Sequence, residues 1–263
     1  MKIGGVLLVA ILFMQAGAWC ADSASFKVLI DFSKSPDAAV YAESARLLCE
    51  EWFPKLNAIL YGKDHPLPFA EVQVLFAGKV VAADGAERSE VAAAADGNKI
   101  WVSSDHCNSY YPTSLPARWP RGFQAMMIHE LAHVVQNYNE FPKTATWVNE
   151  GIADYFRHKY FEKDLESRLR LDSAGYLKGY STEDIQLFNL EKIKAKLHQK
   201  GYLQSYVVAS IFFLWLEERK DKDIVRKLST ALHEGRYSED LFQQHCGAPL
   251  EALWREFFTQ SMP

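Results

Sequence analysis

Cysteine is scarce in this sequence, and so are long hydrophobic runs beyond the N-terminus. The four cysteines are Cys20, Cys49, Cys107 and Cys246, and their spacing matches no cysteine-type zinc motif. If Cys20 is removed with a leader, at most one disulfide and one free thiol remain, and the sequence does not determine the pairing. No later segment is long and apolar enough to cross a membrane. We therefore expect no zinc site made of cysteines and no stable membrane insertion of the mature chain.

An excess of positive charge is also absent, as are internal repeats and low-complexity linkers. The chain has 29 Lys and Arg residues against 33 Asp and Glu residues, a formal net charge of −4, and the basic residues are scattered. Proteins that bind nucleic acids usually carry a basic patch, so no nucleic-acid partner is expected. Hydrophobic residues make up 49% of the chain and aromatic residues 13%, which indicates a packed globular protein. The oligomeric state is not determined by the sequence.

The first twenty residues have the layout of a secretory signal peptide. Lys2 precedes an apolar run over residues 3–14, and small residues follow. The apolar run is too short to span a bilayer comfortably, which argues against a membrane anchor. Cleavage after Ala18 and cleavage after Cys20 both fit the pattern. We predict that residues 1–20 are a signal peptide and that the mature protein is secreted or periplasmic.

Strand patterns cluster in the first hundred residues, and helical patterns fill the rest. Alternating, strand-forming residues occupy 26–32, 71–78 and a hairpin formed by 91–95 and 99–103 around Asp96-Gly97-Asn98. Apolar residues recur at helical spacing in 38–60, 121–138, 146–161 and 206–216. Pro54 is expected to kink or divide the first of these helices. Residues 104–120, which contain three prolines, are predicted to form a loop.

This order of elements predicts an α+β fold. We expect one domain over residues 21–263, with a small mixed β-sheet in an N-terminal lobe that extends to about residue 140. A mainly helical C-terminal lobe follows, with a cleft between the lobes. The strand at 99–103 either lines this cleft, where its backbone could pair with an extended peptide, or is an ordinary edge strand.

The main functional signal is the stretch HELAH at residues 129–133, an HExxH motif. Residues four apart share one face of a helix, so His129 and His133 can direct their imidazoles at a single metal ion. Glu130 lies beside that position and can reach a metal-bound water without being a ligand. The alternative is a pair of surface histidines on an ordinary helix. No proline or glycine interrupts residues 123–138 and apolar residues supply packing faces, so we favour a zinc site on a helix.

A catalytic zinc ion usually has three protein ligands and one open position. A third histidine is excluded, because Gln136 and Asn139 stand where the pattern HExxHxxGxxH needs glycine and histidine. Glu150 follows His133 at a distance that leaves room for a turn and a second, antiparallel helix. We predict Glu150 as the third ligand, although a helix N-terminus by itself favours an acidic residue. Asp154 stays open as a group that orients a ligand histidine, as the third ligand, or as a surface charge.

Four segments resemble the plant basic secretory protein family and its bacterial relatives, a peptidase family of the zincin clan. They are HELAHVVQ (129–136), WVNEGIADYFR (147–157), SYVVASIFFLWLEE (205–218) and LEALWREF (250–257). The resemblance implies a zincin-like fold with an HExxH active-site helix, one Zn²⁺ ion, and a peptide or protein substrate. It also implies that the Glu of the N-E-G core, Glu150, binds the zinc. The chain departs from the family in being mildly acidic and in having apolar residues where members often carry Thr and Arg in the third segment.

Tyr206 matches the family within that third segment. Its hydroxyl could donate a hydrogen bond to a developing oxyanion, which would make Tyr206 a catalytic residue. The alternative is a helix tyrosine that packs its ring and leaves its hydroxyl in water. The sequence alone does not decide between these roles.

Taken together, these residues predict a secreted zinc metallopeptidase. Zinc held by two neutral imidazoles and one carboxylate keeps a net positive charge, which lowers the pKa of its bound water to about 7. Glu130 then serves as the general base and returns the proton to the leaving amine. The second hypothesis is a non-catalytic secreted binding protein, directed at cell-wall or host material, with a vestigial zinc site. The intact Glu130 favours catalysis, because metal binding alone does not need that carboxylate.

Overall fold

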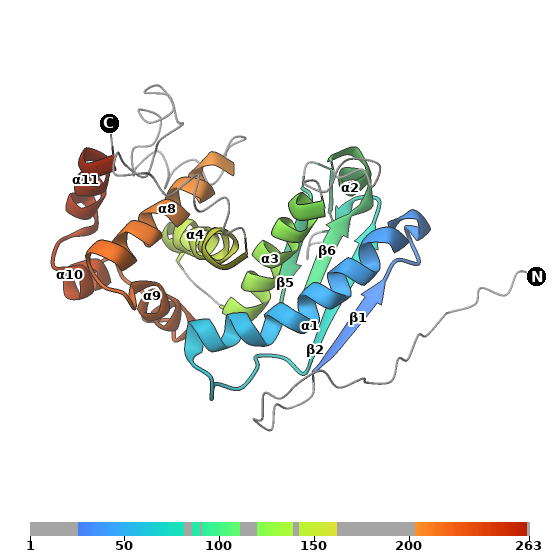
Figure 1. Cartoon of the computed structure of the whole chain (residues 1–263), viewed down its shortest axis with the longest axis horizontal. Coiled ribbons are helices and arrows are strands. Elements are labelled where there is room, and N and C mark those ends of the chain that lie inside the picture. Colours follow the sequence, from blue (N-terminus) through green and yellow to red (C-terminus); the bar gives the residue numbers. More distant parts are fainter. Residues whose placement is uncertain are drawn as a thin grey trace, which may run out of the picture.

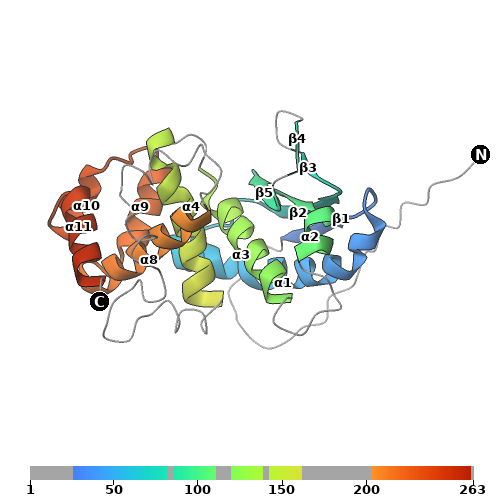
Figure 2. The ribbon, with the colours of Figure 1, turned by 90° about the horizontal axis from the view of Figure 1, so that it is seen from above.

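The computed structural model describes residues 26–81, 86–89, 91–110, 120–138, 142–161 and 203–261. A β-sheet with covering helices forms one end of the molecule, and helices alone form the other end (Figure 1, Figure 2). The α+β class and the small mixed sheet are therefore confirmed, and the described strands all lie before residue 104. The predicted signal peptide lies outside the described residues, and the domain boundaries stay a prediction.

The main sheet has four strands in the order β1-β2-β6-β5. Their bounds are Lys27–Asp31 for β1, Glu71–Ala77 for β2, Lys99–Ser103 for β6 and Ala93–Asp96 for β5. The first three are parallel, and β5 runs antiparallel to β6. The predicted hairpin is confirmed, because Asp96 pairs with Lys99 across a turn in which Gly97 has a φ of 55°. A separate two-stranded ribbon joins β3 (Val80–Val81) to β4 (Glu87–Arg88).

Strand β6 is an inner strand of this sheet, so neither alternative for residues 99–103 holds: its backbone is not open to a peptide, and it is not an ordinary edge strand. Its backbone is paired with β2 on one side and with β5 on the other. The hairpin pattern predicted the two strands but not which of them would add to β2, since that depends on the crossover from β2. Among the described residues, β5 and β1 form the edges of the sheet.

Helix α1 (Ala39–Tyr61) follows the short 3₁₀ turn Pro36–Ala38 and is not divided at Pro54, contrary to one of the two predicted outcomes. Phe53 and Leu56, on either side of the proline, are completely buried. Packing of both halves of the helix therefore outweighs the backbone hydrogen bond that the proline ring removes. The helix lies beside α3 (Pro120–Gln136), which runs along β5 and β6 (Figure 1).

Residues Ser104–Tyr110 form helix α2, where the sequence predicted a loop. The hydroxyl of Ser103 accepts a hydrogen bond from the backbone N–H of His106, which satisfies one of the free donors at the helix start. The sequence contains a helix-start pattern here, with Ser103 as the cap and Asp105 in the first turn. The prolines further along the segment nevertheless favoured the prediction of a loop. The second part of the predicted loop lies outside the described residues.

The helical end of the molecule confirms the predicted helices after residue 146. Its elements are α4 (Thr146–Phe156), a π-helical turn (Arg157–Phe161), α8 (Leu203–Arg219), α9 (Ile224–His233), α10 (Asp240–Cys246) and α11 (Leu250–Ser261). Helix α8 crosses α4, and α11 lies at the end of the molecule far from β1 (Figure 1). No helix within the described ranges has the length and apolar character that a membrane crossing requires.

Aromatic rings hold this helical end together. Phe212, completely buried on α8, packs edge-on against Trp254 with ring centroids 4.7 Å apart and against Phe257 at 5.4 Å. Its ring also lies 5.9 Å from that of Trp215. Because α8 also packs against α4, this cluster connects the C-terminal helices to the helix that carries Glu150.

We expect Phe212→Ala to lower the free energy of unfolding by about 3–5 kcal/mol, because it leaves a cavity within this ring cluster. Denaturation by urea, followed by circular dichroism, measures the change. Val40→Ala is the control, since Val40 is 59% exposed and its truncation should change stability by less than about 0.5 kcal/mol. Equal stability of the two variants would contradict the assignment of this core.

Candidate metal centre

Helix α3 turns two imidazoles toward one point. His129 and His133 are four residues apart, and their rings lie edge to face with centroids 4.8 Å apart. Other faces of the helix are buried, with Ile128 and Leu131 completely inaccessible, and α3 packs against α1, β5 and β6. The rotation of the helix, and with it the direction of both imidazoles, is therefore set by the packing of its apolar faces.

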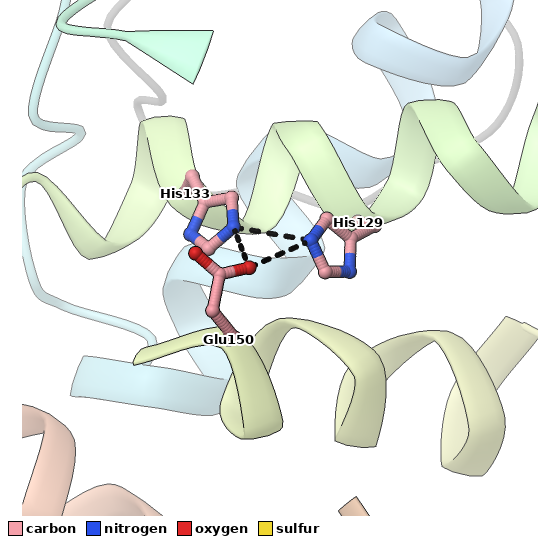
Figure 3. Close-up of side chains that lie close together, drawn as sticks. All are labelled: His129, His133 and Glu150. Carbon is pink, nitrogen blue, oxygen red and sulfur yellow. Dashed lines mark hydrogen bonds and ion pairs between the residues drawn. The ribbon is translucent and has the colours of Figure 1, made fainter. Parts of the chain in front are cut away.

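Glu150 reaches the same point from the neighbouring helix α4 (Figure 3). The Nε2 atoms of His129 and His133 are 3.2 Å apart, and each lies 3.2 Å from Oε2 of Glu150. Ligands about 2.0–2.1 Å from a tetrahedral zinc ion are about 3.3 Å from one another, so the observed triangle fits such an ion closely. These three side chains form the group that could hold a metal ion among the described residues.

The far nitrogen of each histidine has its own acceptor, which fixes the tautomer. Nδ1 of His129 lies 2.9 Å from Oδ1 of Asp154, and Nδ1 of His133 lies 2.7 Å from Oε1 of Gln136. The Gln136 amide is itself oriented, because its nitrogen donates to the carbonyl oxygen of Asn149 at 3.0 Å. With a proton on each Nδ1, both Nε2 atoms present lone pairs to the triangle. Acceptors held on the outer nitrogens in this way are typical of histidines that bind metals.

The electrostatics of the centre favour a positive charge inside the triangle. Burial opposes protonation of His129, but its hydrogen bonds with Asp154 and Glu150 outweigh burial and raise its pKa to about 10. Burial would raise the pKa of Glu150, yet the charge of His133 and the bonds to both histidines hold that pKa at about 2. Three lone-pair donors at 3.2 Å repel one another unless a cation lies between them, and a proton or a metal ion can fill that role.

Glu130 lies beside the triangle but outside it. The residue is only 8% exposed, and the backbone N–H of Ala95 on β5 donates to its carboxylate. Burial raises the pKa of the Glu130 carboxyl, and the two histidines partly offset that rise. The position matches the predicted role of a group that works next to a metal ion without ligating it.

Tyr206, on α8, also lies at the centre. Its ring stacks on the imidazole of His129, with centroids 5.9 Å apart and an angle of 25° between the planes. The segment that contains Tyr206 is more than fifty residues beyond Glu150 in the sequence. The structure therefore brings together every residue that the sequence predicted for the site.

Asp154 is buried behind His129, which rules out the surface-charge interpretation. Burial would raise the pKa of its carboxyl, but the charge of Arg157 and the hydrogen bond of His129 hold that pKa well below its usual range. Its Oδ1 atom bonds to Nδ1 of the imidazole, the nitrogen that faces away from the triangle. The contact is the one expected of a group that orients a ligand histidine.

Two residues that contact the site were missed by the sequence interpretation. Gln136 was considered only as the residue that excludes a third histidine, and Arg157 was not considered. Each has a signal in the helical periodicity, since Gln136 follows His133 by three residues and Arg157 follows Asp154 by three. Such spacing is common on helices, so it becomes informative only when the metal-facing side is known.

Gly151 is required at the crossing of α4 and α8. A Cβ atom at this position would lie 2.7 Å from Cβ of Ala209 and 2.7 Å from Cε2 of Phe213. Real Cβ atoms essentially never approach so closely, so any larger residue would separate the two helices. Because Glu150 precedes this glycine, the crossing distance also controls where the carboxylate lies.

We expect Gly151→Ala to lower the free energy of unfolding by about 1–3 kcal/mol, as overpacking usually does, and to weaken metal binding by displacing Glu150. The double variant Gly151→Ala/Ala209→Gly removes one of the two clashing atoms and should recover part of both losses. Urea denaturation and competition with a chromogenic chelator measure the two effects. Unchanged stability and affinity in Gly151→Ala would contradict the close crossing.

Metal binding should release protons at pH 8. The metal-free centre holds a proton at His129 because its pKa is raised to about 10, and a metal ion must displace that proton to reach Nε2. The apparent affinity for zinc should therefore increase as the pH rises from 6 to 9. Calorimetry in buffers with different ionisation enthalpies counts the protons released. Asp154→Asn removes one cause of the raised pKa and should reduce that number, whereas zinc binding without proton release would contradict this electrostatic account.

Comparison with known proteins adds one match. The family model BSP, described as a peptidase of plants and bacteria, matches residues 187–257. No curated protein and no solved structure matches the chain. The matched segment contains Tyr206, the helices α8 to α10 and the first part of α11, and it begins after the HExxH helix and Glu150. Over residues 187–257 the chain is therefore similar to the BSP family of peptidases of plants and bacteria, which confirms the predicted resemblance for the segments at 205–218 and 250–257.

Proposed function

We propose that the protein is a zinc metallopeptidase of the zincin type that hydrolyses peptide bonds in peptide or protein substrates. The observation that carries the proposal is the triangle of Nε2, Nε2 and Oε2 atoms contributed by His129, His133 and Glu150. The match to a peptidase family supports it independently, because the matched residues do not include the triangle. We also propose that residues 1–20 direct export and that the mature chain acts outside the cell or in a periplasm.

The donor set favours one zinc ion. Two imidazoles and one carboxylate are the protein ligands of one class of catalytic zinc sites, in which a fourth position stays open. When bound, zinc acts as a Lewis acid that acidifies a water molecule and polarises a carbonyl group. His129 and His133 would bind the ion as neutral imidazoles, and their outer nitrogens would donate hydrogen bonds to Asp154 and Gln136.

Glu130 would move the proton. Its carboxylate is buried next to the triangle, and its raised pKa brings it closer to neutral pH, where a general base is most effective. In this role Glu130 accepts a proton from the attacking water and delivers it to the leaving amine. The N–H of Ala95 holds the carboxylate at this position by donating to it from β5.

Strand β5 is suited to bind the substrate backbone. The N–H of Ser103 donates to the carbonyl oxygen of Ala92, and Ala93 pairs with Val102. In an antiparallel pair the backbone groups alternate in direction, so those of Ala93 and Ala95 point away from β6 toward the open edge. Because the N–H of Ala95 donates to Glu130, the N–H and C=O of Ala93 and the C=O of Ala95 are the groups that a peptide could pair with. An extended peptide could add to this edge and lie along α3, with a carbonyl near Glu130.

Tyr206 would supply a hydrogen-bond donor. Its ring is held against His129, and this stacking restricts the orientation of the ring that carries the hydroxyl. A donor at this place could stabilise the negative charge that develops on the carbonyl oxygen during attack.

We expect casein hydrolysis by the purified mature protein to be lost on chelation and restored by zinc. Glu130→Gln should lower the rate by about 10²–10⁴-fold, as expected for loss of a general base, and should keep its metal. His133→Ala should lose the metal as well as the activity, which metal analysis measures.

The matched control is Glu51→Gln, an exposed glutamate on α1 that pairs with Lys55 and should leave the rate unchanged. Full activity in Glu130→Gln, or activity that survives chelation, would refute the mechanism. Tight zinc binding without cleavage of any peptide in a library would favour the non-catalytic binding protein instead.

A further inference from the structure

Asp154 receives two hydrogen bonds on the same oxygen atom. Oδ1 lies 2.9 Å from Nδ1 of His129 and accepts a bond from Nη1 of Arg157 at 3.1 Å. The Asp154 side chain is 3% exposed, and that of Arg157 is 25% exposed. A buried carboxylate needs a positive partner, and a histidine that binds a metal ion is neutral. Arg157 therefore supplies the positive charge next to Asp154 that His129 does not.

Arg157 is itself held in place by a second buried group. Its Nη2 atom lies 3.0 Å from Nε2 of His158, and Nδ1 of His158 lies 2.7 Å from Oγ of Ser210. A guanidinium can only donate, so Nε2 of His158 accepts, and its Nδ1–H is left to donate to the serine hydroxyl. His158 and Ser210 are both completely buried. The guanidinium thus bridges Asp154 and His158, and its planar fork fixes the direction of both bonds.

The bridge lies where the backbone changes its winding. Arg157 and His158 open the π-helical turn Arg157–Phe161 that follows α4. π-Helical turns are rare and are frequent at functional sites. Ser210 lies one helical turn beyond Tyr206 on α8, and the Tyr206 ring stacks on His129. The chain of contacts from His129 through Asp154, Arg157 and His158 to Ser210 therefore returns to the metal centre through α8.

We propose that Arg157 is a positioning residue of the metal centre, which holds Asp154 against His129 and is itself aimed by His158 and Ser210. This inference rests on the proposed metal site. It adds Arg157, which would act on the ion through Asp154 and His129. Arg157 acts through Asp154, whose Oδ1 atom contacts the outer nitrogen of His129. Its removal changes the orientation of the His129 ring and deprives the buried Asp154 charge of its cationic partner among the described residues.

The test measures metal affinity, because a purely structural arginine would not change it. Zinc dissociation constants of the mature protein, Arg157→Met and Arg157→Lys are determined by competition with a chromogenic chelator, and the Co²⁺-loaded proteins are compared by visible absorption. Loss of a group that orients a ligand typically weakens binding 10–100-fold, and we expect a loss in this range for Arg157→Met. The lysine variant restores the charge but not the fork, so we expect partial recovery and an altered Co²⁺ spectrum.

The matched control is Arg226→Met. Arg226 donates to Asp223 three residues before it, the same spacing as in the pair of Arg157 and Asp154, but on the surface helix α9. The zinc affinity of Arg226→Met should equal that of the unmodified protein. A loss in Arg226→Met as large as in Arg157→Met would mean that any change of charge acts on the site, and would overturn the inference.

Further outcomes separate the inference from the proposed function. If Arg157→Met binds zinc as tightly as the unmodified protein, the positioning role is refuted while the metal site stands. If the unmodified protein binds no metal ion, both are refuted. If Arg157→Met does not fold, Arg157→Lys decides, since an unchanged affinity in that variant refutes the need for a fork between Asp154 and His158.

Discussion

The structure of this protein is organised around three lone pairs that meet at one point. The Nε2 atoms of His129 and His133 and the Oε2 atom of Glu150 lie 3.2 Å from one another, and the outer nitrogens of both histidines are already occupied by acceptors. Such an arrangement is repulsive unless a cation lies within it. The surrounding acidic groups favour that cation, and both imidazoles are held so that they face it. The packing of α3 and α4 therefore shapes a group of side chains that could hold an ion.

Close packing of helices makes this convergence possible. Glu150 is carried by α4, whose position depends on α8, and the two helices approach so closely at Gly151 that no side chain fits between them. The aromatic cluster around Phe212 ties α8 in turn to the C-terminal helices. The helical end of the molecule thus supports the centre from a distance, while the sheet supports it through β5 and Glu130. Each half of the chain contributes a part that the other lacks.

A buried hydrogen-bond network extends the centre beyond the residues that face the ion. It runs from His129 through Asp154 and Arg157 to His158 and Ser210, and every link joins a group that donates to a group that accepts. Networks of this kind specify one arrangement of their members, because a partly satisfied buried network is costly. The orientation of a single imidazole is therefore determined by three helical segments and not by α3 alone.

The sequence by itself determined the helix with the HExxH motif, the placement of Glu150 near the two histidines, the hairpin and the α+β order, because each depends on local periodicity or on spacing along the chain. It did not determine that β5 rather than β6 would form the sheet edge, nor that a helix would begin at Ser104. It also did not predict the contacts of Gln136 and Arg157 at the site. These contacts depend on groups brought together by folding, such as the carbonyl oxygen of Asn149 for Gln136. Only the tertiary structure decided these points, because strand order, helix crossing and hydrogen-bond partners depend on contacts between residues far apart in the chain.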